Sequence, residues 1–171
     1  MDSRLEPAKS ATVDEINNRL FFRLFQTGNI YQTQAVREVG VSAVQGAVLG
    51  ELSRELRSGM PFSRLYAYLS VSRQNLDAVL KGLERVRYVE RIEDEGDRRS
   101  KIVRLTPTGA KAWNDILGRS FEFYRQATAG IPQAEIMACA ETLSKIGRGL
   151  KAAKLDSDDT TAGKDGRRRK R

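Results

Sequence analysis

Histidine is absent from this 171-residue sequence, and cysteine occurs once, at Cys139. The first absence removes the commonest general base and the commonest metal ligand, and a single cysteine excludes an internal disulfide. No metal-ligand cluster, glycine-rich phosphate loop or nucleophile motif takes their place. Carboxylates alone can carry out chemistry, so an enzyme is not excluded. Nothing in the sequence favours one, however, and we expect neither a cofactor nor a metal.

Long apolar runs are also missing. No run approaches the roughly 18 residues needed to cross a bilayer, and residues 1–10 mix charges with Pro7 and lack the apolar core of a signal peptide. Hydrophobic residues make up 40% and charged residues 30% of the chain, an ordinary globular balance. We therefore expect a cytoplasmic protein of one domain with tails and no membrane partner.

The charge is unevenly balanced, with a net value of +8. From Asp156 to Arg171 there are six basic and four acidic residues, so this stretch carries +2 and the remaining body carries +6. The stretch has no apolar periodicity, and we interpret residues 156–171 as a disordered basic tail, which either attracts phosphate non-specifically or only aids solubility. A basic body favours a polyanionic partner.

The apolar spacing predicts a series of helices. An amphipathic helix is expected from Val13 to about residue 32, and a second is expected from its N-cap Ser42 to a glycine cap near Ser58–Gly59. Pro61 and Ser63 introduce a short third helix over residues 64–69. After a three-residue turn, Ser72 caps a fourth helix that runs to about residue 87. A helix, a tight turn and a second helix with one apolar stripe are typical of a helix-turn-helix.

Two strand-like runs follow the fourth helix, at residues 89–93 and 101–105, with a charged loop containing Gly96 between them. This pattern predicts a β-hairpin. The expected fold class is therefore mainly α with a small β-hairpin wing (α+β), that is, a winged helix-turn-helix.

Two further helices are expected after the hairpin. Thr106 caps the first, Pro107 is its first residue, and a break at residues 130–132 separates it from the last. The terminal helices carry more large apolar residues than a small winged domain needs, so a homodimer is expected to cover them. The predicted organisation is a flexible N-terminus over 1–12, a domain over 13–155, and the tail. Within the domain, the winged helix-turn-helix covers about 42–106 and the dimerisation helices about 13–32 and 107–155.

The sequence resembles the MarR (multiple-antibiotic-resistance regulator) family from about Val13 to Leu150. Residues 72–76 (SRQNL), 83–84 (LE) and 88–91 (YVER) resemble its recognition helix and first wing strand. Residues 97–99 (DRR) and 105–109 (LTPTG) resemble its Asp-x-Arg wing signature and the segment after it. The resemblance implies a homodimeric transcriptional regulator, most often a repressor, released from its operator by a small ligand, often aromatic. The first helix lacks the cysteine of the oxidant-sensing branch, and the absence of histidine argues against the metal-sensing relatives.

The predicted DNA contacts fall on two elements. Side chains near the N-terminus of a recognition helix reach base edges in the major groove, and the residues at those positions are Ser72, Arg73, Gln74 and Asn75. The alternative is that they are solvated first-turn residues. Lys81 is a candidate phosphate contact or an ordinary surface lysine.

The wing carries the second set, Asp97, Arg98 and Arg99. Arginine suits the negative potential of a narrow minor groove. The resemblance implies that Asp97 holds and aims Arg99. The alternative is a hairpin tip whose charges only aid solubility.

The sequence also offers residues for a small-molecule pocket. Arg19, Phe22, Arg23 and Tyr31 on the first helix are candidate lining residues, together with Trp113 and Phe121. The family habit suggests an aromatic acid or its thioester as the ligand. Such aromatics also serve as core or dimer interface, and helix arginines are often only solvated.

The predicted partners are thus double-stranded DNA with a near-palindromic operator, a second copy of the chain, and a small effector. The alternative function is a winged-helix module for protein–protein interaction without sequence-specific DNA binding.

Overall fold

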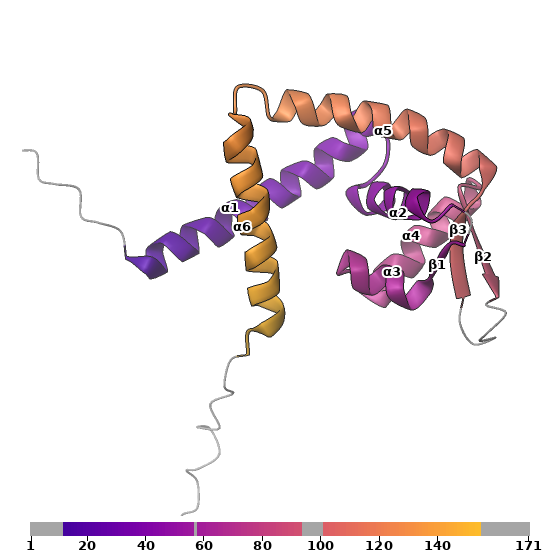
Figure 1. Ribbon diagram of the computed structural model, residues 1–171, viewed down its shortest axis with the longest axis horizontal. Coiled ribbons are helices and arrows are strands. Elements are labelled where there is room, and N and C mark those ends of the chain that lie inside the picture. Colours follow the sequence, from indigo (N-terminus) through magenta and orange to yellow (C-terminus); the bar gives the residue numbers. More distant parts are fainter. Residues whose placement is uncertain (1–11, 57, 94–100, 155–171) are drawn as a thin grey trace, which may run out of the picture. The chain divides into compact units, whose positions relative to one another are not determined.

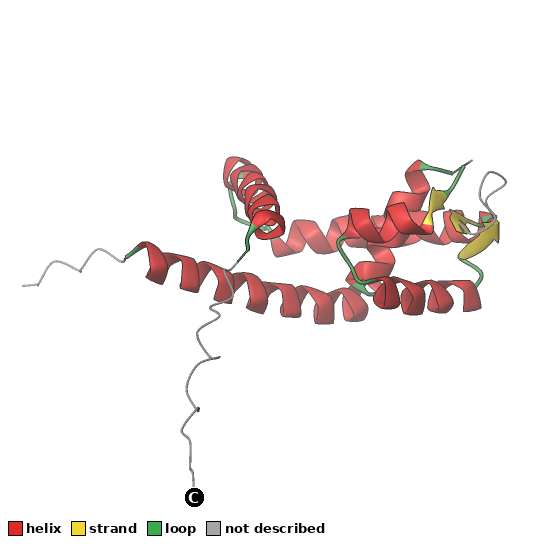
Figure 2. Cartoon of the chain, turned by 90° about the horizontal axis from the view of Figure 1, so that it is seen from below, coloured by secondary structure: helices red, strands yellow, loops and turns green. Residues whose placement is uncertain are grey.

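The computed structural model describes residues 12–56, 58–93 and 101–154. The chain divides into two units, Met1–Ala127 and Thr128–Arg171, and each is described by itself. In the first unit, α1 (Val13–Gln34), the π-helix η1 (Ala35–Val39), α2 (Ala43–Arg54), β1 (Met60–Pro61) and α3 (Phe62–Leu69) precede α4 (Arg73–Arg85), β2 (Val89–Glu93), β3 (Lys101–Leu105) and α5 (Pro107–Ala127). The second unit holds α6 (Gln133–Ala152). The fold is the expected one, mainly helical with one small antiparallel sheet (Figures 1 and 2).

The sheet has three strands in the order β1-β3-β2. The hairpin strands have the predicted bounds, and their register pairs Val89 with Leu105 and Glu93 with Lys101. The third strand, β1, was not predicted, and it pairs Met60 with Val103. A strand of two residues has no alternation to detect, so only the fold reveals it.

The core of the first unit lies where α2, α3 and α4 pack against the sheet (Figure 1). The predicted stripe of α4 is confirmed, since Leu76, Leu80 and Leu83 are buried and Val79 packs against them. The other buried members of this cluster are Val39, Val48, Leu49, Leu52, Met60, Leu65, Val89, Val103, Leu105 and Ile116.

Hydroxyl side chains begin the helices around this core. Ser42 forms a capping box with Gln45 at the start of α2, where the Ser42 Oγ accepts from the Gln45 N–H at 3.2 Å. The Ser72 Oγ accepts from the Asn75 N–H at 3.1 Å at the start of α4. Each hydroxyl satisfies an amide that the helix itself leaves without a partner, as the sequence predicts. Thr12 caps α1 in the same way.

Four predicted helix bounds differ in the structure. α2 ends at Arg54 rather than near Gly59, because Gly59 already lies against β3. Gly59 has a φ of +66°, and a Cβ there would stand 2.6 Å from the Val103 carbonyl oxygen. α3 begins at Phe62, two residues earlier than expected, and α4 ends at Arg85. The chain then turns into β2 through Arg87, which adopts a left-handed φ of +60°. The first helix runs two residues further than expected, to Gln34, and continues as η1.

The start of α5 rests directly on the turn before β2. The Thr106 Oγ1 accepts from the Gly109 N–H at 2.9 Å and donates to the Arg87 carbonyl at 2.6 Å. A Cβ on Gly109 would collide with the backbone of Tyr88. Glycine at this position is therefore required by close packing rather than by its φ angle.

We expect Gly109→Ala to lower the free energy of unfolding by about 2–3 kcal/mol, because a rigid backbone has to move to admit the methyl group. Gly118→Ala is the matched control in the same helix, where a Cβ meets nothing within 4 Å. This control should raise the free energy of unfolding by about 0.5–1 kcal/mol through helix propensity. Denaturant titration of both variants measures the difference, and an equal effect would contradict the packing argument.

Candidate nucleic-acid interface and effector cavity

The exposed face of α4 presents the residues predicted to read DNA. Arg73, Gln74 and Asn75 are all exposed in the first turn of the helix. Ser72 is exposed too, but its hydroxyl already accepts the cap hydrogen bond from Asn75. The opposite face of α4 is fixed in the core by leucines, so the polar first turn is held outward on a rigid support.

Arg73 is oriented by an aromatic ring. Its guanidinium carbon lies 5.7 Å from the centroid of the Phe62 ring, at the start of α3. This cation–π contact restrains the side chain without occupying its N–H donors. A guanidinium with free donors at the N-terminal end of α4 is well suited to base edges or phosphates.

Lys81 is exposed but has a partner. Its Nζ lies 2.8 Å from the Asp77 Oδ2 one turn earlier on α4, and 65% of the lysine side chain is exposed. Lys81 was predicted without an ion-pair partner, and Asp77 was not predicted as one. Spacing of i and i+4 is the signal that would have found the pair.

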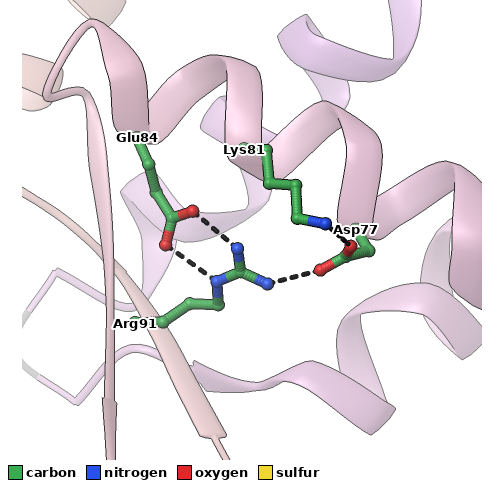
Figure 3. Close-up of polar contacts among 4 residues, drawn as sticks. All are labelled: Asp77, Lys81, Glu84 and Arg91. Carbon is green, nitrogen blue, oxygen red and sulfur yellow. Dashed lines mark hydrogen bonds and ion pairs between the residues drawn. The ribbon is translucent and has the colours of Figure 1, made fainter.

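Asp77 also belongs to a cluster that joins α4 to the sheet (Figure 3). Arg91 of β2 donates from Nε to the Glu84 Oε1 at 2.7 Å and from Nη2 to the Glu84 Oε2 at 2.6 Å. The Arg91 Nη1 donates to the Asp77 Oδ1 at 2.6 Å. One guanidinium therefore holds two carboxylates of α4, and Asp77 lies between Arg91 and Lys81.

The charges of this cluster stabilise one another's ionised forms. Hydrogen bonds from Lys81 and then from Arg91 lower the pKa of Asp77, and the bond to Glu84 is the main cause that raises the pKa of Arg91. Arg91 is the most sheltered member, with 23% of its side chain exposed. Both shifts favour the charged forms, the carboxylate of Asp77 and the guanidinium of Arg91.

The wing strands are held together by cross-strand ion pairs. Arg104 donates from Nε to the Glu90 Oε1 at 2.7 Å, and the Lys101 Nζ lies 3.0 Å from the Glu93 Oε1. The predicted tip residues Asp97, Arg98 and Arg99 lie outside the described residues, between the ends of these two strands.

A cavity of about 510 Å³ opens between η1, α2, α3 and α5. Of the predicted lining residues, Tyr31, Trp113 and Phe121 line it. Arg19, Phe22 and Arg23 are exposed on α1 and are not among its lining residues. Trp113 packs over α2 at Gly50, where a Cβ would lie 3.1 Å from the indole ring.

Tyrosine and serine hydroxyls, with one glutamate and one arginine, supply the polar side chains that line this cavity. The Tyr31 and Tyr124 hydroxyl oxygens lie 3.1 Å apart, and their ring centroids are 6.3 Å apart. Burial raises the pKa of the Tyr31 phenol to about 12, and the contact with Tyr124 acts in the same direction. Two charged residues of α2, Glu51 and Arg54, also line the cavity. The Arg54 Nη1 lies 3.2 Å from the Glu51 Oε2 in an ion pair.

Comparison with known proteins identifies the winged part of the chain. The model of the MarR family matches residues 39–100, which run from the last residue of η1 through α2, β1, α3, α4 and β2. The winged-helix region of this chain is a MarR-family domain. The resemblance given by the SRQNL and DRR segments is thereby confirmed.

One curated relative is the transcriptional activatory protein BadR of Rhodopseudomonas palustris (strain ATCC BAA-98 / CGA009), which is 45% identical over 103 residues. This match covers 58% of the chain, and the chain spans 59% of the length of BadR. Two solved MarR-like structures show the same fold. The Staphylococcus aureus MepR–DNA complex is 20% identical with a TM-score of 0.64, covering 82% of this chain and 100% of that one. PcaV of Streptomyces coelicolor, solved with its natural ligand, is 18% identical with a TM-score of 0.68, covering 82% and 98%.

Outside the MarR-family domain, two helices keep their apolar side chains exposed. α1 has no buried residue, and neither has α6. On α1 the exposed apolar side chains include Val13, Ile16, Leu20, Phe21, Phe22, Leu24, Phe25 and Ile30; on α6 they include Ile136, Met137, Leu143 and Leu150.

The described part of the chain contains no group of three or more histidine, cysteine, aspartate or glutamate side chains that could hold a metal ion. None of its helices is long and apolar enough to cross a membrane. Cys139, on α6, is a free and exposed thiol.

The Tyr31 phenol gives the folded protein a pH dependence that can be measured. A tyrosine in the unfolded chain ionises near pH 10, whereas Tyr31 in the folded chain ionises near pH 12. Between these values the unfolded state has released a proton that the folded state retains, so stability falls as the pH rises from about 10 to 12. We expect Tyr31→Phe to lose part of this fall.

The measurement is denaturant unfolding at several alkaline pH values. Tyr66→Phe, a tyrosine of α3 that does not line the cavity, controls for the loss of a hydroxyl. An unchanged alkaline slope in Tyr31→Phe would contradict the assignment.

Proposed function

We propose that this chain is a homodimeric, sequence-specific DNA-binding transcriptional regulator whose DNA binding responds to a small molecule. The observation that supports this most is the outward polar first turn of α4, supported by a leucine face and joined to the wing strand through Arg91. The MarR-family match covers this region, and BadR is by its name a transcriptional regulator.

In the proposed complex, α4 enters the major groove with its N-terminal end. Arg73 reads guanine, and Gln74 and Asn75 read adenine, each worth about 1–3 kcal/mol of discrimination. Ser72 lies beside them at the base edges, and Lys81 contacts phosphate by exchanging its carboxylate partner Asp77. Arg98 and Arg99 enter the neighbouring minor groove, and Asp97 aims Arg99. MepR, a structural neighbour of this chain, has been solved bound to DNA.

The exposed apolar residues of α1 and α6 support the proposed homodimer. Side chains such as Phe25, 65% exposed, and Met137, 58% exposed, are costly to leave in water. A second copy of the chain is proposed to cover them, as the sequence predicts. Two recognition helices on one face of DNA then require a near-palindromic operator with half-sites about 10–10.5 base pairs apart.

The effector is proposed to occupy the cavity lined by Tyr31, Trp113 and Phe121. Its aromatic walls suit a flat apolar ring, and the phenolic hydroxyls suit a polar substituent. This supports an aromatic acid or its thioester. PcaV was solved with its natural ligand, which makes ligand binding a known property of one neighbour of this fold.

The direction of regulation has two candidates. The family resemblance favours a repressor that leaves its operator when the ligand binds. The name of BadR, which is 45% identical over 103 residues, favours an activator. A promoter–reporter fusion with and without this chain separates them, because the reporter signal rises on deletion of a repressor and falls on deletion of an activator.

The first functional prediction concerns DNA. Asn75→Ala should weaken binding to a selected operator by about 1–3 kcal/mol and leave non-specific binding nearly unchanged. Arg99→Ala should abolish operator binding while the dimer stays folded. Arg37→Ala, an exposed arginine on η1, is the control and should bind as the native protein does.

Gel-shift titrations on operator and scrambled duplexes measure these effects, and sedimentation confirms the dimer. Affinity should also fall steeply with salt, with a log–log slope of about −0.9 for each phosphate neutralised. A protein-interaction module would show little slope, and native affinity in Arg99→Ala would refute the wing assignment.

The second functional prediction uses Trp113, the sole tryptophan of the chain. Binding of an aromatic acid in the cavity should change the intrinsic fluorescence of Trp113 at the same concentration that alters DNA binding. Ala47→Leu adds bulk to the cavity wall from α2 and should shift both titrations to higher ligand concentration. A ligand that alters DNA binding without a fluorescence change would place the effector site elsewhere.

A further inference from the structure

We propose that Arg91 is a positioning residue for DNA recognition, which fixes the wing strand β2 at a set angle to the recognition helix α4. This inference rests on the proposed function. Arg91 is not expected to touch DNA, because its three donor nitrogens are engaged by Glu84 and Asp77 and the side chain is 23% exposed.

The geometry of attachment supports this role. Glu84 and Asp77 are seven residues apart on α4, which is about 10 Å along the helix axis. Both carboxylates converge on the one guanidinium of Arg91, so turning that group about either carboxylate breaks its hydrogen bonds to the other. Figure 3 shows the guanidinium lying between the two carboxylates, with its fork on Glu84 and its remaining nitrogen directed to Asp77.

The position of Arg91 in β2 carries this restraint to the wing. Arg91 is the third residue of β2, and it pairs with Val103 in the centre of the hairpin register. The strand continues for two residues beyond it, to Glu93. An orientation fixed at Arg91 is therefore carried through the register with β3 to the end of β2 at Glu93.

Arginine is required for this arrangement, and lysine does not replace it. A guanidinium offers a planar fork and a further N–H in fixed directions, whereas an ammonium is a point charge that cannot form two parallel bonds to one carboxylate. Arg91→Lys therefore keeps the charge and most of the stem but loses the two-point attachment.

The chain offers a matched control in Arg104. It lies on β3 of the same sheet, and its Nε donates to the Glu90 Oε1 at 2.7 Å, so this ion pair joins the two wing strands rather than the sheet and α4. Arg104→Lys is the same chemical change in the same hairpin without a link to the recognition helix.

The experiment uses the full chain and a duplex selected from random DNA by the native protein. Arg91→Lys should raise the operator Kd by about tenfold, comparable to losing one base contact, and should change the Kd for a scrambled duplex by less than about twofold. Arg104→Lys should leave both constants within about twofold of native. Equal losses on both duplexes, or native operator affinity in Arg91→Lys, would overturn the inference.

A readout without DNA separates this inference from the proposed function. Spin labels at Ala78→Cys on α4 and Glu93→Cys on β2, in a Cys139→Ser background, report the helix-to-strand distance in labelled chains diluted with unlabelled ones. Arg91→Lys should broaden the distance distribution, and Arg104→Lys should not. If the distance distribution of Arg91→Lys is as narrow as that of the native protein, the inference is wrong. If the native protein selects no duplex from random DNA, the proposed function is wrong, and the distance measurement still tests the inference.

Discussion

The rest of the candidate DNA-binding surface depends on one charged contact, the guanidinium of Arg91 between Glu84 and Asp77. Leucine packing fixes how deeply α4 sits in the core, but apolar contacts are not directional and do not fix the rotation of a strand beside a helix. Hydrogen bonds to charged groups are directional and short. The core thus holds α4 in place, and Arg91 sets the direction in which the wing leaves it.

Further contacts restrain both ends of α4. At its N-terminal end, the Ser72 hydroxyl accepts the cap hydrogen bond from the Asn75 N–H, and the Phe62 ring restrains Arg73. Arg87 ends the turn after α4 in a left-handed conformation, held through the Thr106 hydroxyl on its carbonyl. Because both ends of α4 and its link to β2 are constrained, the side chains of its first turn have little freedom to lose when they bind a partner.

Much of this fold could be predicted from local sequence. The Ser42 and Ser72 caps, the leucine stripe of α4 and both hairpin strands depend on residues within a turn or a strand of each other, where spacing decides the outcome. The strand β1 and the early end of α2 could not be predicted, because both result from pairing with β3 some forty residues later. Arg91 was visible as part of a family-like segment, but its role depends on partners seven and fourteen residues away across a turn. Likewise, a cavity side chain such as Trp113 is distinguished from a solvent-facing aromatic only by what packs around it.

The charged residues of the cluster on α4 and β2 differ in how exposed they are. The cluster of Asp77, Lys81, Glu84 and Arg91 sums to zero, so it adds nothing to the attraction of a polyanion at long range. Within it, Arg91 is 23% exposed and Lys81 is 65% exposed. An exposed pair such as Lys81 with Asp77 is worth little in water, so the lysine can exchange its carboxylate for a phosphate at small cost. Breaking the contacts of Arg91 would leave the Glu84 carboxylate, whose side chain is 29% exposed, without its cation, which is costlier. The two cations of the cluster therefore have different roles. Lys81 remains available to a ligand, and Arg91 maintains the position of β2 beside α4.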